Sequence, residues 1–512
     1  MNMAADIRPD DWSQRLQVLG VTVTHLVTDS RMVQVGDTFV AYPGVQTDGR
    51  RFIEQAIANG ANAVIWEAHG FVWDESWQVP HLAVAELRQQ AGALADHVYG
   101  APSRKLWMVG VTGTNGKTTC SHWIARTLNS LGRKTALLGT LGNGFPGELH
   151  PSLNTTPEAV SVHGLLAEYL QQGARATAME VSSHALAQGR VNGVHYDVAL
   201  LTNLSRDHLD YHGDMHHYAA AKRRLFDWKH LKHAVLNLDD SFGAELAETL
   251  RDAEVEVVGY GLGEAALQLA ERLGIRMVFG AALHMDAQGM VIHIHSSWGG
   301  TQLHSRLIGR FNAANLLGTL AVLLVGGVEL SSAVGELAQQ KAVPGRMQTL
   351  GGKDKPTVVV DYAHTPDALE KVLQTLREVT PAGSGKIICV FGCGGDRDRG
   401  KRPMMGTVAS RFADECIVTS DNPRSESPKA IIDAILFGVQ GDAYQVIEDR
   451  AHAITRAVAT ARAEDTVLIA GKGHEDYQEI NGEKHPFSDS EVVRRALSVW
   501  APVDLKREWS TA

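Results

Sequence analysis

One stretch of the sequence combines residue types and spacing that suit phosphate binding: Gly113-Thr114-Asn115-Gly116-Lys117-Thr118-Thr119. Glycines allow consecutive backbone N–H groups to turn inward on an anion, and a helix N-terminus adds partial positive charge. In such a loop Lys117 would reach the β- and γ-phosphates, and the Thr118 hydroxyl would ligate Mg²⁺. The general pattern G-x-x-x-x-G-K-S/T is broken only at Val111, where its first glycine is expected. Because the stretch joins a strand-like run to a helix-like run, we interpret it as a nucleotide site rather than a turn that binds nothing.

Two other groups of side chains follow strand-like runs and could hold a cation. Glu180 can face a nucleotide-bound cation from the carboxyl edge of a parallel sheet, or it can cap the next helix, and the sequence favours neither. His208, His212 and His216 recur every four residues, which invites a zinc interpretation. Because Gly213 interrupts that helix and no cysteine is near, we expect a single histidine to help hold Mg²⁺.

Basic residues gather in three further places. Lys222-Arg223-Arg224 lies on a probable amphipathic helix and by itself is typical of a solvated basic face. Farther along, the segments 392–402 and 421–424 each follow a strand and carry arginines. Two neighbouring loops with guanidinium groups suit a carboxylate, and their acidic residues could hold an ammonium group. The two loops are therefore compatible with a zwitterionic amino acid as ligand, and surface ion pairs explain them equally well.

The elements that must position these residues follow an alternating strand and helix pattern. Such alternation predicts parallel, doubly wound α/β sheets. Pro344-Gly345 interrupts the pattern and predicts a hinge, and Trp298-Gly299-Gly300 predicts the turn of a β-hairpin. We expect three domains, over residues 1–103, 104–344 and 345–512. The predicted strands cover residues 106–111, 176–181, 198–202, 234–238, 290–296, 301–307, 357–361, 386–391, 415–419 and 466–470, and the predicted helices include 117–131 and 366–378.

Length and composition are those of a multidomain globular protein. The 512 residues suggest about three domains. The net charge of −10 argues against a broad nucleic-acid-binding surface, and four cysteines without a C-x-x-C pair argue against a structural zinc site. The apolar run 316–328 is too short to span a bilayer, so we expect a buried core helix there. Residues 1–11 lack the apolar region of a signal peptide, and we expect a cytoplasmic protein without membrane insertion.

Taken in order along the chain, these and other motifs resemble the Mur ligase family of peptidoglycan synthesis over nearly the whole length. Valine in place of the first glycine, as at Val111, is also typical of that family. Besides the glycine-rich loop, the motifs that carry the resemblance are Asn154-Thr155-Thr156-Pro157, Met179-Glu180-Val181-Ser182-Ser183-His184, the segment from Thr202 to His208, Phe311-Asn312-Ala313-Ala314-Asn315, Pro344-Gly345-Arg346-Met347, Asp361-Tyr362-Ala363-His364-Thr365-Pro366 and Gly471-Lys472-Gly473-His474-Glu475.

The resemblance implies an α/β protein of three domains, with a central doubly wound, mostly parallel sheet of the P-loop type and a Rossmann-like C-terminal domain. It also implies an ATP- and Mg²⁺-dependent ligase that forms an amide bond and produces ADP. The substrates would be UDP-N-acetylmuramoyl-L-alanyl-D-glutamate and meso-2,6-diaminopimelate, because Asp421-Asn422-Pro423-Arg424 resembles the diaminopimelate signature. The D-Glu γ-carboxylate would be activated as an acyl phosphate and then attacked by the amine.

The resemblance also assigns roles to individual residues. Lys117, Glu180, His208 and Lys222 are implied to be catalytic, with Thr118, Glu180, His208 and a carbamate formed on Lys222 as metal ligands. The implied nucleotide contacts are Gly113, Thr114, Asn115, Gly116, Lys117, Thr118, Thr119, Asn312, Arg346 and Asp361. The implied substrate contacts are Thr28, Ser30, Val45, Gln46 and Thr47 for the UDP end, Asn154, Thr155, Thr156, Ser182, Gln188 and Arg190 for the dipeptide, and Arg397, Asp421, Asn422, Pro423, Arg424, Gly471 and Glu475 for the amino acid.

Two kinds of alternative function stay open from the sequence. The chain could be a lysine-adding or folylpolyglutamate-type ligase of the same superfamily, although Arg424 and the residues around Ser30 argue against both. It could also be a nucleotide-binding regulator without turnover, although such a protein would not need Lys117, Thr118, Glu180, His208 and Lys222 together. We expect a monomer.

Overall fold

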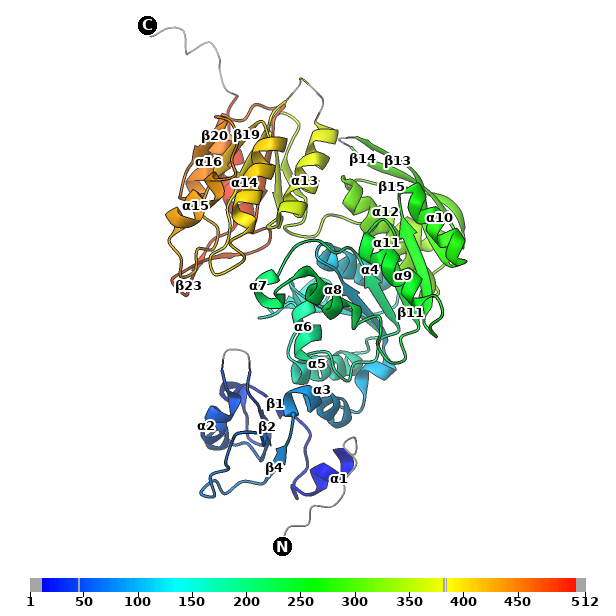
Figure 1. Ribbon diagram of the computed structural model, residues 1–512, viewed down its shortest axis with the longest axis vertical. Helices are drawn as coiled ribbons and strands as arrows, with labels where there is room; N and C mark the ends of the chain where they lie inside the picture. Colours follow the sequence, from blue (N-terminus) through cyan, green and yellow to red (C-terminus); the bar gives the residue numbers. More distant parts are fainter. Residues whose placement is uncertain (1–11, 45–46, 287, 381–382, 384, 503–512) are drawn as a thin grey trace.

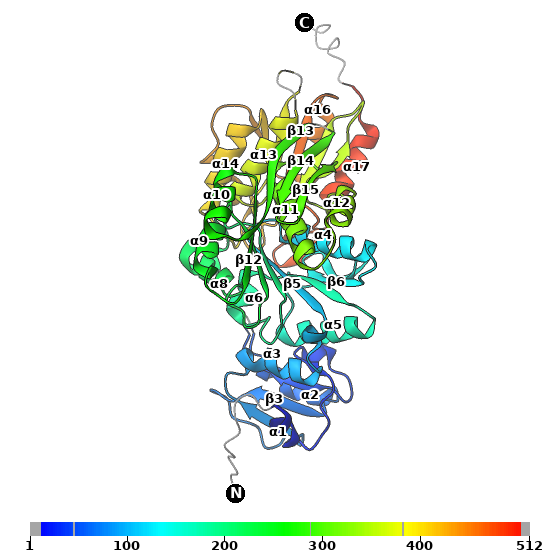
Figure 2. The same ribbon diagram turned by 90° about the vertical axis from the view of Figure 1, so that its right-hand side faces the viewer.

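The computed structural model describes residues 12–44, 47–286, 288–380, 383 and 385–502, and it contains three α/β units along its long axis (Figures 1 and 2). The first unit has a four-stranded parallel sheet in the order β1-β2-β3-β4. Alternate residues of its strands enter different cores, since Phe39 and Val40 pack on opposite faces. Its elements are α1 (Trp12–Gln17), β1 (Leu26–Val27), η1 (Ser30–Met32), β2 (Thr38–Ala41), η2 (Gly49–Phe52), α2 (Ile53–Ala58), β3 (Ala63–Glu67), β4 (His81–Val84), α3 (Leu87–Val98) and η3 (Pro102–Lys105).

The central unit is built on an eleven-stranded sheet in the order β15-β14-β13-β12-β11-β10-β5-β9-β6-β7-β8. From β13 to β6 neighbouring strands are parallel, and antiparallel strands continue the sheet at both edges. The strands are β5 (Trp107–Thr112), β6 (Thr135–Gly139), β7 (Gly142–Phe145), β8 (Glu148–His150), β9 (Ala176–Glu180), β10 (Val198–Leu201), β11 (His233–Asn237), β12 (Glu256–Gly261), β13 (Arg276–Asp286), β14 (Gly289–Ser296) and β15 (Gly299–Ser305).

Helices cover both faces of this sheet and bury a separate core on each. Helices α4, α11 and α12 pack on one face, and α5, α6, α9 and α10 pack on the other. The core helix predicted over 316–328 corresponds to α11, which ends three residues earlier at Val325 and is buried from Leu316 to Leu324. No helix among the described residues is long and apolar enough to cross a membrane. The helices are α4 (Lys117–Ser130), α5 (Ala159–Gln171), α6 (Ser183–Gln188), α7 (Leu209–His212), α8 (Met215–Arg223), α9 (Ser241–Leu250), α10 (Glu264–Leu273), α11 (Arg310–Val325) and α12 (Leu330–Ala338).

The C-terminal unit has a six-stranded sheet in the order β16-β17-β21-β18-β19-β20, parallel except at β16. Helices α13, α14 and α15 cover one face, and α16 and α17 cover the other. A two-stranded hairpin, β22–β23, stands apart from the sheet. The elements are β16 (Gln348–Gly351), β17 (Thr357–Asp361), α13 (Pro366–Val379), β18 (Ile387–Phe391), α14 (Lys401–Phe412), β19 (Glu415–Val418), α15 (Pro428–Leu436), β20 (Tyr444–Val446), α16 (Arg450–Thr460), β21 (Thr466–Ala470), β22 (Tyr477–Ile480), β23 (Glu483–Pro486) and α17 (Asp489–Val499).

The predicted fold class is confirmed, and every strand predicted from the sequence is present within two residues of its expected ends. The largest difference is in the hairpin, where β15 begins at Gly299 instead of Thr301. Gly299 has a φ of 124°, so it can enter the ladder directly after the turn without the steric cost of a side chain. In the part of the chain that the structure describes, no sheet crosses the proposed boundaries at 103/104 and 344/345, which remain predictions.

Candidate active site in the cleft between the central and C-terminal units

The glycine-rich loop lies where the strand order of the central sheet changes direction. β5 pairs with β10 on one side and β9 on the other, so the loops after all three strands meet at one edge. A Cβ at Gly113 would stand 1.9 Å from Thr202 Oγ1, and one at Gly116 would stand 2.6 Å from Asn315 Oδ1. Val111, in contrast, is a buried residue of β5. The glycine that the general pattern places there is not needed, because the turn begins two residues later.

Lys117 is folded back on the loop that it belongs to. Its Nζ donates hydrogen bonds to the carbonyl oxygens of Gly113 and Thr114, each at 2.9 Å. Burial lowers the pKa of Lys117, while the carboxylates of Glu180 and Asp207 oppose that shift. The loop therefore carries its ammonium group on the inside, beside two acidic groups and the first turn of α4.

Glu180 faces the loop and not the next helix. Its Oε2 accepts hydrogen bonds from Thr118 Oγ1 at 2.8 Å and Thr140 Oγ1 at 3.1 Å, and its Oε1 accepts one from the Thr140 N–H at 2.8 Å. The cap of α6 is Ser182, whose Oγ accepts from the Ala185 N–H. The helix-cap interpretation of Glu180 is therefore wrong, and its carboxylate is buried beside the loop threonine.

His208 lies in the cleft, close to Asp207. Its Nε2 is 3.4 Å from Asp207 Oδ2, and burial lowers the pKa of His208 to about 3. A neutral imidazole keeps a lone pair that can ligate a cation. Thr118, Glu180 and His208 all line the same cleft and supply a hydroxyl, a carboxylate and an imidazole. Hydroxyl and carboxylate oxygens such as those of Thr118 and Glu180 suit a magnesium ion, whereas an imidazole more often ligates transition metals.

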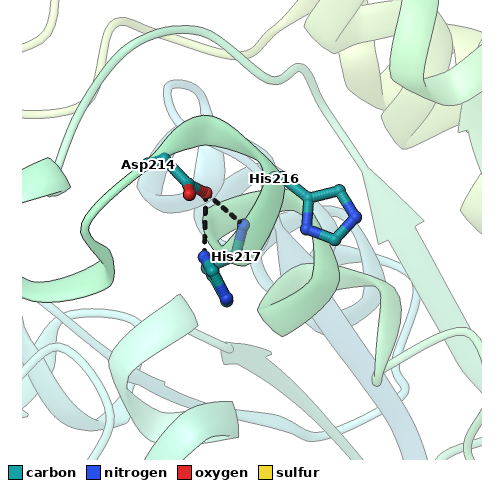
Figure 3. Close-up of side chains that lie close together, drawn as sticks. All are labelled: Asp214, His216 and His217. Atoms are coloured by element: carbon teal, nitrogen blue, oxygen red, sulfur yellow. Dashed lines mark hydrogen bonds and ion pairs between the residues drawn. The ribbon is translucent and has the colours of Figure 1, made fainter.

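The three histidines at four-residue spacing do not share a helix. α7 ends at His212, Gly213 follows with a φ of 82°, and a new helix, α8, begins at Met215. Among the described residues, one group of at least three possible ligands lies close enough to hold a metal: the exposed Asp214, His216 and His217. Figure 3 shows Asp214 engaged with the backbone N–H and ring of His217, at 2.8 and 2.9 Å, whereas His216 points away. Asp214 thus serves as the N-cap of α8.

Lys222 is not part of a solvated basic face. Its side chain is 1% exposed, its Nζ donates to Gly113 O at 2.8 Å, and the ammonium lies 4.5 Å above the Tyr218 ring. Burial, together with the nearby charge of Lys117, lowers the pKa of Lys222 well below its ordinary value. The neighbouring Arg224 is exposed, as the amphipathic pattern predicts. The structure thus places a second lysine nitrogen on the inner side of the glycine-rich loop.

A cleft of about 1700 Å³ extends from this loop to the C-terminal unit. Arg346, next to the predicted hinge, donates through Nη2 to Thr118 Oγ1 at 3.4 Å, and its guanidinium stacks 4.2 Å from the Tyr362 ring. Among the described residues, the buried Nη1 of Arg346 has no hydrogen-bond partner. Asp361 holds this junction by accepting from the Met347 and Ala363 N–H groups. Except for Gly113, the predicted nucleotide contacts, Asn312 included, line the cleft.

The predicted amino-acid contacts divide into two layers. Arg397, Arg424 and Glu475 line the cleft, whereas Asp421, Asn422, Pro423 and Gly471 are not among its lining residues. The inner layer supports the outer one, since Asn422 Nδ2 donates to Glu475 Oε2 at 2.8 Å. A Cβ at Gly471 would stand 2.5 Å from Asp421 Oδ2, so this glycine is required for close packing.

Most of the predicted dipeptide contacts belong to the same cleft as Glu180. Asn154, Thr155, Thr156, Ser182 and Arg190 line the cleft. Gln188 lies behind Arg190 and accepts from its Nε at 2.9 Å.

The contacts predicted for the UDP end belong to the N-terminal unit and are outside the cleft. Ser30 Oγ donates to Gln55, Thr28 is half-buried, Thr47 is exposed, and Val45 and Gln46 lie outside the described residues.

Several supporting residues were not identified from the sequence. Lys472 is buried and donates to Asn422 Oδ1 at 2.9 Å and Glu475 Oε2 at 2.8 Å. Arg450 makes a buried bidentate pair with Asp489 and also donates to the Ala470 carbonyl. Lys472 belongs to the motif Gly471-Lys472-Gly473-His474-Glu475, so the sequence could have indicated that it supports the site. Arg450 and Asp489 carry no such signal, because they come from two separate helices.

The chain matches known proteins over nearly its full length. The family models described as Mur ligase family, catalytic domain; Mur ligase middle domain; and Mur ligase, glutamate ligase domain match residues 22–99, 111–323 and 345–473. The UDP-N-acetylmuramoyl-L-alanyl-D-glutamate–2,6-diaminopimelate ligase of Chromobacterium violaceum is 52% identical, over 96% of this chain and 97% of that protein. The enzyme of the same name from Nitrosomonas europaea is 50% identical, over 99% of each chain. A solved structure of a ligase with this name superposes with a TM-score of 0.65 at 39% identity, covering 93% of this chain and 95% of that chain. The chain therefore belongs to the Mur ligase family.

Proposed function

We propose that this protein is an ATP-dependent ligase that joins meso-2,6-diaminopimelate to the γ-carboxylate of UDP-N-acetylmuramoyl-L-alanyl-D-glutamate, in peptidoglycan synthesis. The observation that carries the proposal is the single cleft in which Lys117, Thr118 and Glu180 on the central unit face Arg397, Arg424 and Glu475 on the C-terminal unit. One wall suits phosphate and the other suits a zwitterionic amino acid. The relatives named for this reaction support the same assignment.

The first step is transfer of the ATP γ-phosphoryl group to the D-Glu γ-carboxylate, which yields an acyl phosphate and ADP. The loop N–H groups and Lys117 bind the phosphates, and Arg346 reaches the same place from the hinge. Thr118, Glu180 and His208 would hold Mg²⁺, which neutralises phosphate charge when bound. Asn154, Thr155, Thr156, Ser182 and Arg190, supported by Gln188, hold the muramoyl dipeptide beside them.

In the second step the neutral amine of diaminopimelate attacks the acyl carbonyl, phosphate leaves, and the nitrogen loses one proton to the phosphate or to water. Glu475 has one carboxylate oxygen occupied by Lys472 and Asn422, so its other oxygen is available to the amino group. Arg397 and Arg424 bind carboxylates of the incoming amino acid. Much of the rate enhancement then comes from holding the amine and the acyl phosphate in one closed cleft.

Lys222 is proposed to react with CO₂ and become a carbamate. That reaction needs a neutral amine, and the burial that lowers the pKa of Lys222 favours it. The product is an anion at a place where the unmodified chain has two lysine nitrogens around Gly113 O. A carbamate there would ligate a second Mg²⁺ and place a negative charge beside the ammonium group of Lys117.

Each of the three domains binds a different ligand. Residues 1–103 hold the UDP end through Thr28, Ser30 and the segment 45–47, residues 104–344 bind ATP, and residues 345–512 bind the amino acid. The protein acts as a monomer in the cytoplasm, where its nucleotide substrates are made, and it needs neither nucleic acid nor membrane insertion.

The experiment that tests the function measures phosphate release from ATP with each substrate present or omitted. We expect release to require the UDP-linked dipeptide and meso-diaminopimelate together. Equal or faster release with L-lysine would contradict the substrate assignment and favour a lysine-adding enzyme. No release with any amino acid, despite measurable ATP binding, would support a nucleotide-binding regulator instead.

Replacing Arg424 by alanine should raise the KM for meso-diaminopimelate by about tenfold to a hundredfold, with a smaller change in kcat, because a ground-state contact to a carboxylate is lost. Steady-state kinetics with saturating ATP and dipeptide measure both constants. Arg411→Ala, which removes an exposed arginine of α14 in the same unit, is the matched control. An unchanged KM in Arg424→Ala would show that this arginine does not bind the substrate.

A further inference from the structure

Arg424 is clamped by the β22–β23 hairpin, which the sequence did not connect to the amino-acid site. The Arg424 N–H donates to the Glu479 carbonyl at 3.0 Å, and the Asn481 N–H donates to the Arg424 carbonyl at 2.8 Å. Arg424 has a φ of 51°, a left-handed conformation that costs about 1 kcal/mol or more for a residue with a side chain. The hairpin hydrogen-bonds to both the N–H and the carbonyl of Arg424 and thereby stabilises its left-handed backbone conformation.

The same hairpin also binds the Arg424 side chain. Nε donates to Glu479 Oε2 at 3.0 Å, and Nη1 donates to Gly395 O at 2.8 Å. Nη2 has no hydrogen-bond partner among the described residues. Arg424 lines the cleft and Glu479 does not, so the carboxylate lies behind the guanidinium. The Nε hydrogen is therefore already used, and Nη2 together with the second N–H of Nη1 remains for a ligand.

Glu479 is held in its own place by the amino-acid site. Its backbone N–H donates to Asn422 Oδ1 at 3.0 Å, and that oxygen also accepts from Lys472. Asn422 in turn donates to Glu475. One continuous set of hydrogen bonds thus links the carboxylate that would receive the amino group to the carboxylate that orients Arg424.

We propose that Glu479 is a positioning residue that sets the specificity of this ligase for an amino acid with a second carboxylate. The inference rests on the proposed function. By accepting from Nε, Glu479 prevents Arg424 from binding a carboxylate through Nε, and it leaves Nη2 and the second N–H of Nη1 for the substrate carboxylate. An arginine has several rotatable bonds, so without this acceptor its guanidinium samples orientations that do not match the carboxylate.

The test compares Glu479→Ala with Glu479→Gln. We expect Glu479→Ala to raise the KM for meso-diaminopimelate about tenfold, the effect of losing one charge-assisted hydrogen bond. kcat and the KM values for ATP and dipeptide should stay close to wild type. Glu479→Gln keeps an acceptor for Nε and should restore most of the affinity. Glu483→Ala, at an exposed position of the same hairpin, is the control.

Specificity gives a readout that a merely structural role would not change. In Glu479→Ala the ratio of kcat/KM for meso-diaminopimelate to kcat/KM for L-lysine should fall about tenfold. Lysine has no second carboxylate for Arg424 to bind, so only the value for diaminopimelate should decrease. An unchanged KM in Glu479→Ala, or an equal loss for both amino acids, would overturn the inference while leaving the proposed function intact. A wild-type enzyme that releases no phosphate with meso-diaminopimelate would contradict the proposed function itself, and the inference with it.

Discussion

Replacing Lys222 by alanine is expected to lower kcat by about 10³-fold or more, the size of effect seen when a preorganised charge is removed from an active site. Lys222 is buried against the loop that would carry the phosphates, and its Nζ contacts Gly113 O at 2.8 Å. If the nitrogen carries a carbamate, its loss removes an anion that holds a cation at the transferred phosphate. The measurement is kcat for phosphate release with all substrates saturating.

Small carboxylates separate the carbamate from a packing role. Formate or acetate should enter the space left in Lys222→Ala and restore a saturable part of the activity, since they replace the missing anion. Removal of CO₂ and bicarbonate should slow the wild-type enzyme reversibly and leave Lys222→Ala unaffected. Lys229→Ala, at an exposed lysine beyond α8, should behave as wild type. Full activity of Lys222→Ala would contradict any role of the carbamate.

Replacing Lys117 by methionine should also lower kcat by about 10³-fold or more, because the charge that stabilises phosphoryl transfer is removed while the aliphatic stem is kept. In the present structure Lys117 Nζ binds Gly113 O and Thr114 O, so the ammonium group is already in the loop that would hold the phosphates. Neighbouring Glu180 and Asp207 favour its charged form against the effect of burial on its pKa.

Binding and turnover must be measured separately for this variant. The Kd for ADP should rise only a few fold, about 1 kcal/mol or less, if Lys117 acts mainly on the transition state. Single-turnover formation of the acyl phosphate should show the full loss. Lys105→Met, at an exposed lysine outside the cleft, is the control. A variant with normal turnover would exclude the loop as the site of phosphoryl transfer.

Local chemistry made much of this protein predictable. The strand at 357–361 is present as predicted, because a short apolar run bounded by polar and turn residues has few alternatives. The loop at Gly113–Gly116 was also recognisable, because its glycines take positive φ angles that other residues adopt only at a cost. Residues adjacent in sequence determine such features.

Other parts of the site depend on long-range packing and could not be derived from the same signals. Lys222 and Arg224 belong to one run of basic residues, yet one is buried beneath the glycine-rich loop and the other is exposed. Glu180 had two equally good interpretations until the contact with Thr118 excluded the cap. Arg424 suggested a free bidentate fork, and the structure shows its Nε bound to a glutamate 55 residues away.

The sequence by itself indicated which residues could do chemistry, where ten of the strands lie, and which family the chain belongs to. It could do so because periodicity, turn residues and motif spacing are properties of short segments. Only the tertiary structure decided which of those residues face one another across the cleft and which lie behind them. The reason is that the strand order of each sheet does not follow the sequence, so it brings together loops that are dozens of residues apart. Whether a charge is buried, and which way a guanidinium points, depends on the partners that those loops supply.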